Sequence, residues 1–240
     1  MRIVSMTERP ELVPAVSKLP NQWPTFMQQS PTAHRLYGPM LETFGELQLI
    51  MVEGARPIAF LHAVPIAWDG PEALPDRGWD AALEGAFRLP GPTPAVSLIE
   101  ARIDPNRTGQ GLSMMLLNAA RERIRDLGYQ HLVGPVRPNQ KLTEPLTPMA
   151  EYAARVRPDG LPVDAWLRTH VRIGGKIIKV CPLSMIIPGT LDQWRGWTGL
   201  PFDRSGDIEV PGGVAPVHVS VEQDHAVYVE PNVWVHHPLV

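Results

Sequence analysis

The chain has 240 residues, 44% of them hydrophobic and 20% charged, which is typical of a globular protein with one sizeable core. Its net charge of −3 at pH 7 gives no overall field that favours nucleic acid or an anionic membrane, so any anion site has to be local. The single cysteine excludes an intrachain disulfide and a cysteine-rich zinc site, and without a signal-peptide core or an apolar run near the ~20 residues of a membrane span we expect a cytoplasmic protein.

Residues 1–44 combine short helical stretches with several prolines, a pattern that predicts helices broken by turns. Two runs rich in aliphatic residues follow, at residues 47–52 and 57–64. Residues 53–56 between them contain a glycine, so we predict an antiparallel hairpin with a four-residue turn.

Residues 68–94 form an insertion in which residues 79–87 predict a short helix bracketed by glycine and proline. Residues 95–103 predict a strand, because they are mostly aliphatic and stop before a proline that cannot donate to a strand ladder. The next helix is predicted to begin at Leu112 and to end at Gly128, since apolar side chains recur there every three or four residues.

Residues 137–163 form a second, proline-rich insertion. The last segment contains two further strand-like runs, at residues 214–221 and 226–235.

Gly109-Gln110-Gly111 lies between the strand that ends at residue 103 and the helix that begins at Leu112. The two glycines allow positive φ angles and close approach of a ligand, and the free N–H groups of the first helical turn attract an anion. The alternative interpretation is a tight turn with no ligand. A third glycine and a Gly-Lys-Ser/Thr sequence are both absent, which argues against NAD and ATP. We therefore predict a pyrophosphate site of another kind.

The order strand, Asp-Pro, Gly-x-Gly, amphipathic helix and short strand resembles motif A of the GNAT superfamily of acyl-CoA-dependent N-acyltransferases, which bind the pyrophosphate of coenzyme A. The resemblance covers about residues 45–190: residues 129–136 are similar to the family's fifth strand and residues 164–178 to its last helix and following strand. Two positions depart from the family pattern. Asn106 stands where the family usually has glutamine or arginine, and Thr108 stands where it has a basic residue, with Arg107 displaced by one. Backbone amides should therefore provide more of the phosphate contacts.

The resemblance implies an α/β (α+β) fold with a GNAT-type mixed, mostly antiparallel central sheet flanked by helices, with two insertions and a C-terminal extension. In this organisation residues 1–44 form an N-terminal helical segment on the acceptor side. Residues 45–190 form the acyltransferase core, with insertions at residues 68–94 and 137–163. Residues 191–240 form an extension that completes the sheet.

The resemblance also implies coenzyme A or acyl-CoA as co-substrate, and no metal. The implied coenzyme-binding residues are Ile103, Asn106, Arg107, Thr108, Gly109, Gln110, Gly111, Leu112, Ser113 and Asn139. Arg137 and Lys141, beside Asn139, are secondary candidates for the phosphates or the pantetheine amides, with a solvated loop as the alternative. His236 and His237 do not predict a metal site, because adjacent residues on a strand point to opposite faces and no carboxylate lies at ligand spacing.

Acyl transfer to an amine requires a base that removes the proton of the amine. Glu100 is the first candidate, since it lies on the strand that enters the glycine turn. Strand alternation predicts that it shares a face with Val96 and Leu98, where partial burial would make it a stronger base. The alternative is an ion pair with Arg102 or an exposed side chain.

His170 occupies the position, four residues before Gly174, at which similar helices of the family carry a tyrosine. The resemblance therefore implies that His170 is the general acid for the departing thiolate, a role that histidine can fill near neutral pH. The alternative is a structural or surface histidine.

By this resemblance we expect an enzyme that transfers an acyl group from an acyl-CoA, or a related thioester, to an amine by direct attack in a ternary complex. We expect a small-molecule amine acceptor, no membrane partner, and no nucleic acid apart from an aminoacyl-tRNA donor. The alternatives that stay open are transfer from a carrier protein or an aminoacyl-tRNA, decarboxylation of the thioester, and a non-catalytic module that senses acyl-CoA. The sequence identifies neither the acceptor, the acyl chain nor the oligomeric state.

Overall fold

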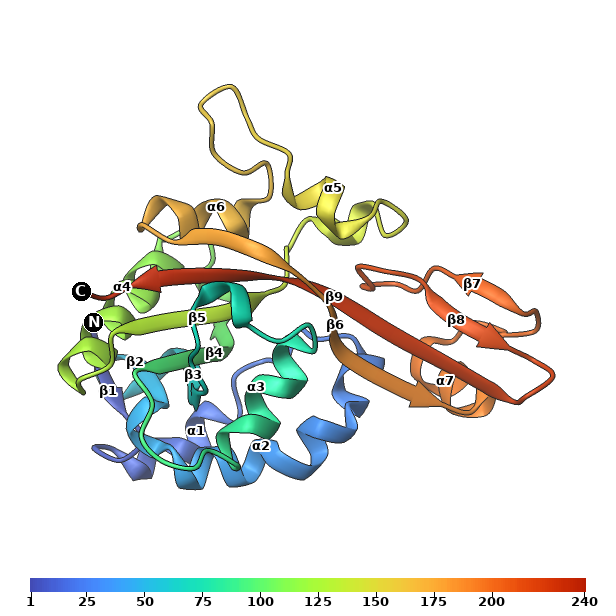
Figure 1. The fold of residues 1–240 in the computed structure, drawn as a ribbon. Helices are drawn as coiled ribbons and strands as arrows, with labels where there is room; N and C mark the ends of the chain where they lie inside the picture. Colours follow the sequence, from blue (N-terminus) through green and yellow to red (C-terminus); the bar gives the residue numbers. More distant parts are fainter.

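The fold is described from a computed structural model that covers residues 1–240. Nine strands form a single sheet in the order β1-β2-β3-β4-β5-β9-β8-β7, and β6 pairs with β9 outside this path (Figure 1). Every strand pair is antiparallel except β4 with β5. The predicted mixed, mostly antiparallel sheet is therefore confirmed.

The strands are β1 (Arg2–Ser5), β2 (Leu49–Glu53), β3 (Arg56–Ile66), β4 (Ala95–Ile103), β5 (His131–Val136), β6 (Lys176–Gly189), β7 (Gly206–Ile208), β8 (Val217–Ser220) and β9 (His225–Pro238). The helices are α1 (Val13–Val16), α2 (Pro31–Thr43), α3 (Gly78–Ala86), α4 (Leu112–Asp126), α5 (Met149–Ala153), α6 (Ala165–Arg172) and α7 (Leu191–Thr198). No helix combines the length and the hydrophobicity that a membrane span needs.

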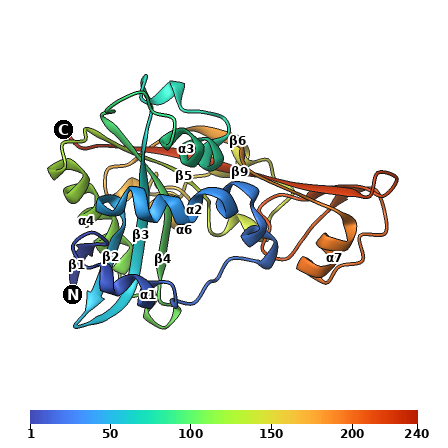
Figure 2. The same cartoon turned by 90° about the horizontal axis from the view of Figure 1, so that it is seen from below.

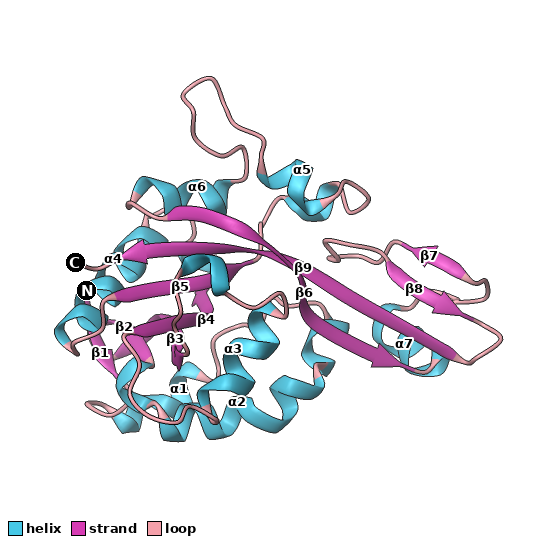
Figure 3. Ribbon diagram, viewed as in Figure 1, coloured by secondary structure: helices cyan, strands magenta, loops and turns pink.

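The central sheet separates two layers of helices, with α1, α2 and α3 on one face and α4, α5 and α6 on the other (Figures 1 and 3). The alternation of side chains along each strand produces this division. On β4, Val96 packs into the cluster built around Leu116 and Leu117 of α4, whereas Ala95 and Ile99 pack into the cluster that contains α3. Each face of the sheet therefore has its own apolar core.

An arm made of β7, β8, α7 and the far halves of β6 and β9 extends beyond the central sheet (Figure 1). It exists because β9 is long enough to pair with β5 through residues 233–238 and with β8 through residues 225–228. The predicted C-terminal strands are thus present, and they join the same sheet as the core.

The N-terminal segment differs from its prediction as a purely helical segment. Residues 2–5 form the edge strand β1 against β2, because Val4 is buried in the apolar cluster of that edge. Helix α2 also continues through Pro39, where we predicted a break, and the tertiary packing of its residue Met40 outweighs the lost backbone hydrogen bond. Between α1 and α2 the chain runs along the side of the sheet on which α1, α2 and α3 lie (Figure 2).

Candidate active site

The parallel strands β4 and β5 are paired over three residues only, from Ala95 with His131 to Ser97 with Val133. Beyond this point β4 continues beside β3 and β5 continues beside β9, so the two strands diverge towards their carboxyl ends. Leu98 and Gly134 touch at the start of the gap, where a Cβ on Gly134 would lie 3.1 Å from the Cβ of Leu98. We call this opening the β4–β5 fork. Ligands of α/β sheets commonly bind where strands part in this way.

The turn that leaves β4 is held by Asp104, which is 2% exposed. Its Oδ1 accepts hydrogen bonds from the backbone N–H and the side-chain amide of Asn106, both at 3.0 Å, and Oδ2 pairs with Arg56 at 2.7 Å. Arg107 is fixed by two bonds to the carboxylate of Glu53, at 2.7 and 2.8 Å. The loop that precedes the two glycines therefore has a defined shape.

The backbone amides of residues 109–114 donate no hydrogen bond within the chain, and the first bond of α4 runs from Met115 N–H to Gly111 C=O at 3.2 Å. Gly109 and Gly111 have φ angles of +77° and +71°, and a Cβ at either position would meet no atom within 4 Å. Their surroundings are open and their N–H groups lie at the positive end of α4. Such a set of free amides fits a diphosphate.

The remaining predicted coenzyme-binding residues surround this turn in different ways. Leu112 is buried in the core below α4 and Ile103 is half-buried, so both can offer only their backbone. Thr108 and Ser113 lie at the surface of the turn, where the hydroxyl of Thr108 donates to the carbonyl of Pro105 at 3.1 Å. Gln110 accepts a bond from Arg107 at 3.1 Å.

Only Asn139 among the three candidates after β5 is free, being exposed and without a side-chain hydrogen bond. Lys141 is fully buried and donates to the carbonyls of Glu144, Pro145 and Val214, at 2.5, 3.2 and 3.0 Å. Its neighbour Arg137 is also engaged, as described below. Neither basic residue is available to phosphate or exposed in a solvated loop, because each meets acceptors on distant segments that the sequence does not reveal.

Glu100 lies on β4 beyond the last pair with β5, but not on the face predicted for it. His62 pairs with Glu100 and Ala63 with Leu98, so Ile99 is an extra residue that forms a β-bulge. The bulge turns Glu100 away from the α4 face, where Leu98 packs, and towards α2. The strand alternation assumed from the sequence fails at this point.

The carboxylate of Glu100 is 7% exposed and accepts hydrogen bonds from three side chains. Arg102 donates from Nη2 at 2.6 Å and Nε at 3.0 Å, and Trp23 donates from its indole N–H at 3.0 Å. The hydroxyl of Tyr37 on α2 donates to the second carboxylate oxygen. The ion pair with Arg102, which was the alternative interpretation, is therefore present.

His62 lies opposite Glu100 on β3 and is 2% exposed. Its ring stacks on Phe60 at 4.3 Å and meets Tyr37 edge-on at 5.8 Å. Burial lowers the pKa of His62 to about 4, so the ring is neutral at physiological pH. The carboxylate of Glu100 is thus surrounded mainly by aromatic side chains, those of Trp23, Tyr37 and His62.

Trp23 contacts both strands of the β4–β5 fork, β4 directly and β5 through the residue that follows it. On one side it donates to Glu100 of β4, and on the other its ring lies 5.3 Å from the guanidinium of Arg137, which directly follows β5. Arg137 in turn pairs with the buried carboxylate of Glu230 at 2.9 Å. The segment before α2 therefore covers the opening from the α2 side, and it adds an indole to the site.

His170 of α6 is 1% exposed and its Nδ1 lies 2.9 Å from Nε2 of His237 on β9. Burial, and then the neighbouring His237, lower the pKa of His170 to about 3, so the ring is neutral near pH 7. His237 pairs with Leu132, the residue directly before the last β4–β5 pair. His170 therefore lies near the root of the fork on the α4 face, whereas Glu100 lies on the α2 face.

Sequence reasoning missed four residues of this region: Trp23, Tyr37, His62 and His237. None belongs to a motif, and only strand alternation gave a signal, by placing His236 and His237 on opposite faces. The structure agrees with that placement, since His236 lies 3.1 Å from His131 and His237 contacts His170. No cluster of three or more His, Cys, Asp or Glu side chains is arranged to hold a metal ion.

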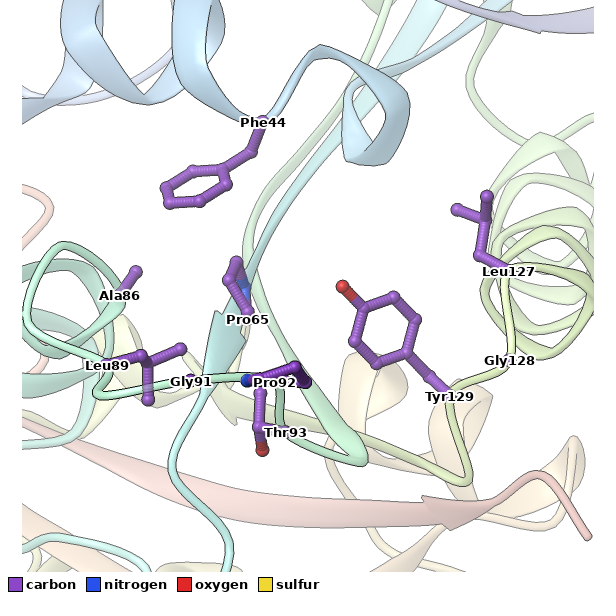
Figure 4. A pocket seen from close by; sticks show the side chains of 10 residues that line it. All are labelled: Phe44, Pro65, Ala86, Leu89, Gly91, Pro92, Thr93, Leu127, Gly128 and Tyr129. Carbon is purple, nitrogen blue, oxygen red and sulfur yellow. The ribbon is translucent and has the colours of Figure 1, made fainter.

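Two surface cavities lie away from the fork. One, of about 450 Å³, lies where the chain enters β4 and β5, and the rings of Phe44 and Tyr129 project into it (Figure 4). The other, of about 730 Å³, is lined by residues 200–204 and 207–209 together with Leu146. Neither is lined by a predicted site residue, so neither competes with the fork as the reaction site.

Comparison with known proteins agrees with this geometry. No protein-family model matches the chain. The arginine N-acetyltransferase avaD from Aspergillus versicolor is 29% identical over 251 aligned residues, covering 90% of this chain and 85% of that protein. The loading GNATL domain of CurA from Lyngbya majuscula is a structural neighbour with a TM-score of 0.60 and 17% identity, covering 99% of this chain and 96% of that one. The GphF GNAT-like decarboxylase in complex with isobutyryl-CoA has a TM-score of 0.63 and 18% identity, covering 100% of both chains.

The divergent parallel strands and the likeness to these two neighbours show that the chain has a GNAT-type fold.

Proposed function

We propose that the protein transfers an acyl group from acyl-CoA to the amine of a small molecule, by direct attack within a ternary complex. The β4–β5 fork carries this proposal, because it opens between the free amides of α4 on one face and the carboxylate of Glu100 on the other. A thioester held by the amides would present its carbonyl between the two faces.

In this proposal the diphosphate of the co-substrate binds the amides of residues 109–114, which fix its position without a lysine or arginine side chain. The pantetheine arm enters the fork. Glu100 accepts the proton of the attacking amine, the carbon–nitrogen bond forms, and the carbon–sulfur bond breaks with release of coenzyme A. His170 lies on the side of the fork that α4 occupies, and we assign it to the leaving sulfur.

For the acceptor we propose an amino acid with a cationic side chain, and arginine is the first compound to test because avaD is named as an arginine N-acetyltransferase. The reacting nitrogen would be the α-amine, since a guanidinium stays protonated at any physiological pH whereas an amine has a reachable free base. Charges of both signs lie near the fork, with Glu100 and Glu230 as anions and Arg102 and Arg137 as cations. A zwitterionic acceptor is complementary to such a site.

The test is a matrix of purified protein with acetyl-CoA, longer acyl-CoAs and malonyl-CoA against arginine, lysine, ornithine, citrulline and simple diamines. Thiol release and product mass are both measured. Thiol release that depends on the amine, with an N-acylated product, supports the proposal. Arginine methyl ester and agmatine serve as controls that lack the carboxylate.

The same matrix separates the alternatives. Loss of carbon dioxide from malonyl-CoA without amide formation would indicate a decarboxylase. Activity with an acylated carrier protein or an aminoacyl-tRNA in place of acyl-CoA would indicate another donor. Binding of coenzyme A without turnover of any amine would indicate a sensing module.

A further inference from the structure

We propose that His237 acts as a positioning residue that holds His170 in the tautomer with its proton on Nε2, so that a buried neutral histidine becomes a directed hydrogen-bond donor to the leaving sulfur. The inference rests on the proposed function for the role of the sulfur. The hydrogen-bonded histidine pair, on which the tautomer depends, is given by the geometry.

The imidazoles of His170 and His237 are hydrogen-bonded to each other. Nδ1 of His170 and Nε2 of His237 lie 2.9 Å apart, and both rings are within 1% of complete burial. The other ring nitrogens, Nε2 of His170 and Nδ1 of His237, are buried and have no hydrogen-bond partner in the chain. The pair therefore has one hydrogen bond between the rings, and each ring has a second nitrogen without a partner.

A hydrogen bond between two neutral imidazoles needs one N–H and one bare nitrogen, so only two arrangements exist. In the first, His237 donates from Nε2, which leaves His170 with an N–H at Nε2 and His237 with a bare Nδ1. In the second, His170 donates from Nδ1, which leaves His170 bare at Nε2 and His237 with an N–H at Nδ1. Only the first arrangement gives His170 a free donor.

Arg121 of α4 lies close to this pair. Its guanidinium donates to the carbonyl of Ile173 at 2.7 Å, and its Nη2 lies 3.9 Å from the position of a Cβ on Gly174. The ring of His237 lies beside the next residue, with its Cε1 2.6 Å from the Cβ position of Gly175. The cation also helps to lower the pKa of His237 to about 4, after burial as the first cause. Arg121 therefore helps to keep His237 neutral, which both arrangements require.

An N–H on Nε2 would let His170 act on the leaving sulfur although its burial keeps the ring neutral. An imidazolium acid is not present near neutral pH in a ring with such a low pKa, but a neutral N–H can still stabilise negative charge that develops on sulfur. A thiol is a weak acid with a pKa near ~8.5, so a hydrogen bond to the departing thiolate suffices and the proton can follow from solvent.

The test has a spectroscopic and a kinetic part, with the neighbouring residue as a matched control. Long-range ¹H–¹⁵N correlation spectra of the labelled protein report the tautomer of each histidine. We expect the proton of His170 on Nε2. In His237→Leu the donor to Nδ1 is lost and the Nε2 tautomer of His170 should no longer dominate, while His237→Gln, whose amide can donate, should keep it. His236→Leu, on the other face of β9, should leave the His170 signals unchanged.

In steady-state kinetics we expect kcat to fall about tenfold in His237→Leu, with an unchanged KM for acyl-CoA, because one directed donor to a charged group contributes about a factor of ten. The kcat should recover substantially in His237→Gln. It should stay at the wild-type value in His236→Leu. A wild-type spectrum with the proton of His170 on Nδ1 would overturn the proposal, even if no variant folds. So would a His237→Leu protein that retains the Nε2 tautomer and full kcat. If no amine is acylated at all, the proposed function fails, whereas the tautomer assignment is still decided by the spectra.

Discussion

Ser97 and Val133 form the last residue pair between β4 and β5, and the proposed site lies around the point where that pairing stops. Glu100 lies three residues further along β4, on the side of α2. The partner of His170 lies beside the residue that precedes Val133, on the side of α4. A carboxylate and a histidine therefore lie on opposite faces of the sheet near the point where β4 and β5 part.

The first prediction concerns the free amides at the start of α4. Gly111→Ala places a Cβ at a φ of +71°, which costs roughly 1 kcal/mol of stability in the left-handed region. The methyl group would also face the proposed position of the diphosphate, so we expect the Kd for coenzyme A to rise about tenfold, the value of about one charged hydrogen bond. Isothermal titration calorimetry measures the Kd.

Gly160→Ala is the matched control, since Gly160 has a φ of +77°, equally open surroundings and a position in the second insertion. It should lose similar stability and bind coenzyme A as the wild type does. Equal affinities in both variants would contradict the assignment of the phosphate site.

The second prediction concerns Glu100. Glu100→Gln keeps the size of the side chain and an acceptor for Trp23 but removes the base, so kcat should fall by about 10² or more while the KM for acyl-CoA stays the same. Glu144→Gln, which breaks a more exposed ion pair with Arg155, should have wild-type activity. A Glu100→Gln enzyme with an unchanged rate across the pH range would reduce Glu100 to a structural partner of Arg102.

The third prediction concerns Trp23, whose indole N–H occupies one oxygen of Glu100. Trp23→Phe keeps an aromatic ring beside Arg137 and removes that donor. If the amine and the indole compete for the same oxygen, the KM for the amine should fall several-fold while kcat changes little. Steady-state kinetics with the amine varied would measure this, with Trp197→Phe in α7 as control. A raised KM would mean instead that the indole contacts the acceptor directly.

The fourth prediction is a loss of stability in mild acid. His62, His170 and His237 are buried, and burial lowers their pKa values to about 4, 3 and 4. Near pH 5 the unfolded chain binds protons at these positions, where the ordinary pKa is about 6.5, and the folded chain does not. Unfolding then takes up three protons, so these groups lower the free energy of unfolding by about 4 kcal/mol for each pH unit of acidification.

Asp80 acts in the opposite direction. Burial raises its pKa to about 6, so between about pH 4 and pH 6 the folded chain holds a proton that the unfolded chain releases. The net slope near pH 5 should therefore be about 3 kcal/mol per pH unit, and Asp80→Asn should steepen it. Urea titrations at pH 7, 6 and 5 measure the slope. A free energy of unfolding that is constant over this range would show that the three histidines are not neutral in the folded protein.

Much of the fold could be predicted from the sequence. The hairpin of β2 and β3, the strands β4 and β5, the helices α3, α4 and α6 and the two C-terminal strands all appear close to their predicted positions. These elements depend on periodicity and on local breakers, which short segments carry by themselves. The edge strand β1 was missed, because a four-residue strand is stabilised only by the partner that it finds on β2.

The site was predicted in part. The turn between β4 and α4 could be predicted because glycine, Asp104 and the start of α4 act on their immediate neighbours, whereas its binding of phosphate stays a prediction. The face of Glu100 was predicted wrongly because one extra residue, Ile99, changes the alternation, and a β-bulge has no reliable sequence signature. The engagement of Lys141 with three carbonyls was equally invisible, since one of its acceptors, Val214, lies 73 residues away.

The sequence by itself determined the local chemistry of this protein: where the backbone can adopt positive φ, where a helix begins with free amides, and which strand carries a carboxylate into the turn. Such features depend on dihedral preferences and on residues within one or two turns of each other. Only the tertiary structure decided that β4 and β5 part after Ser97, that Trp23 reaches Glu100 from 77 residues away, and that His170 meets His237 across 67 residues. These contacts depend on the register of a nine-stranded sheet and on the packing of both its faces, which no single segment of the chain encodes.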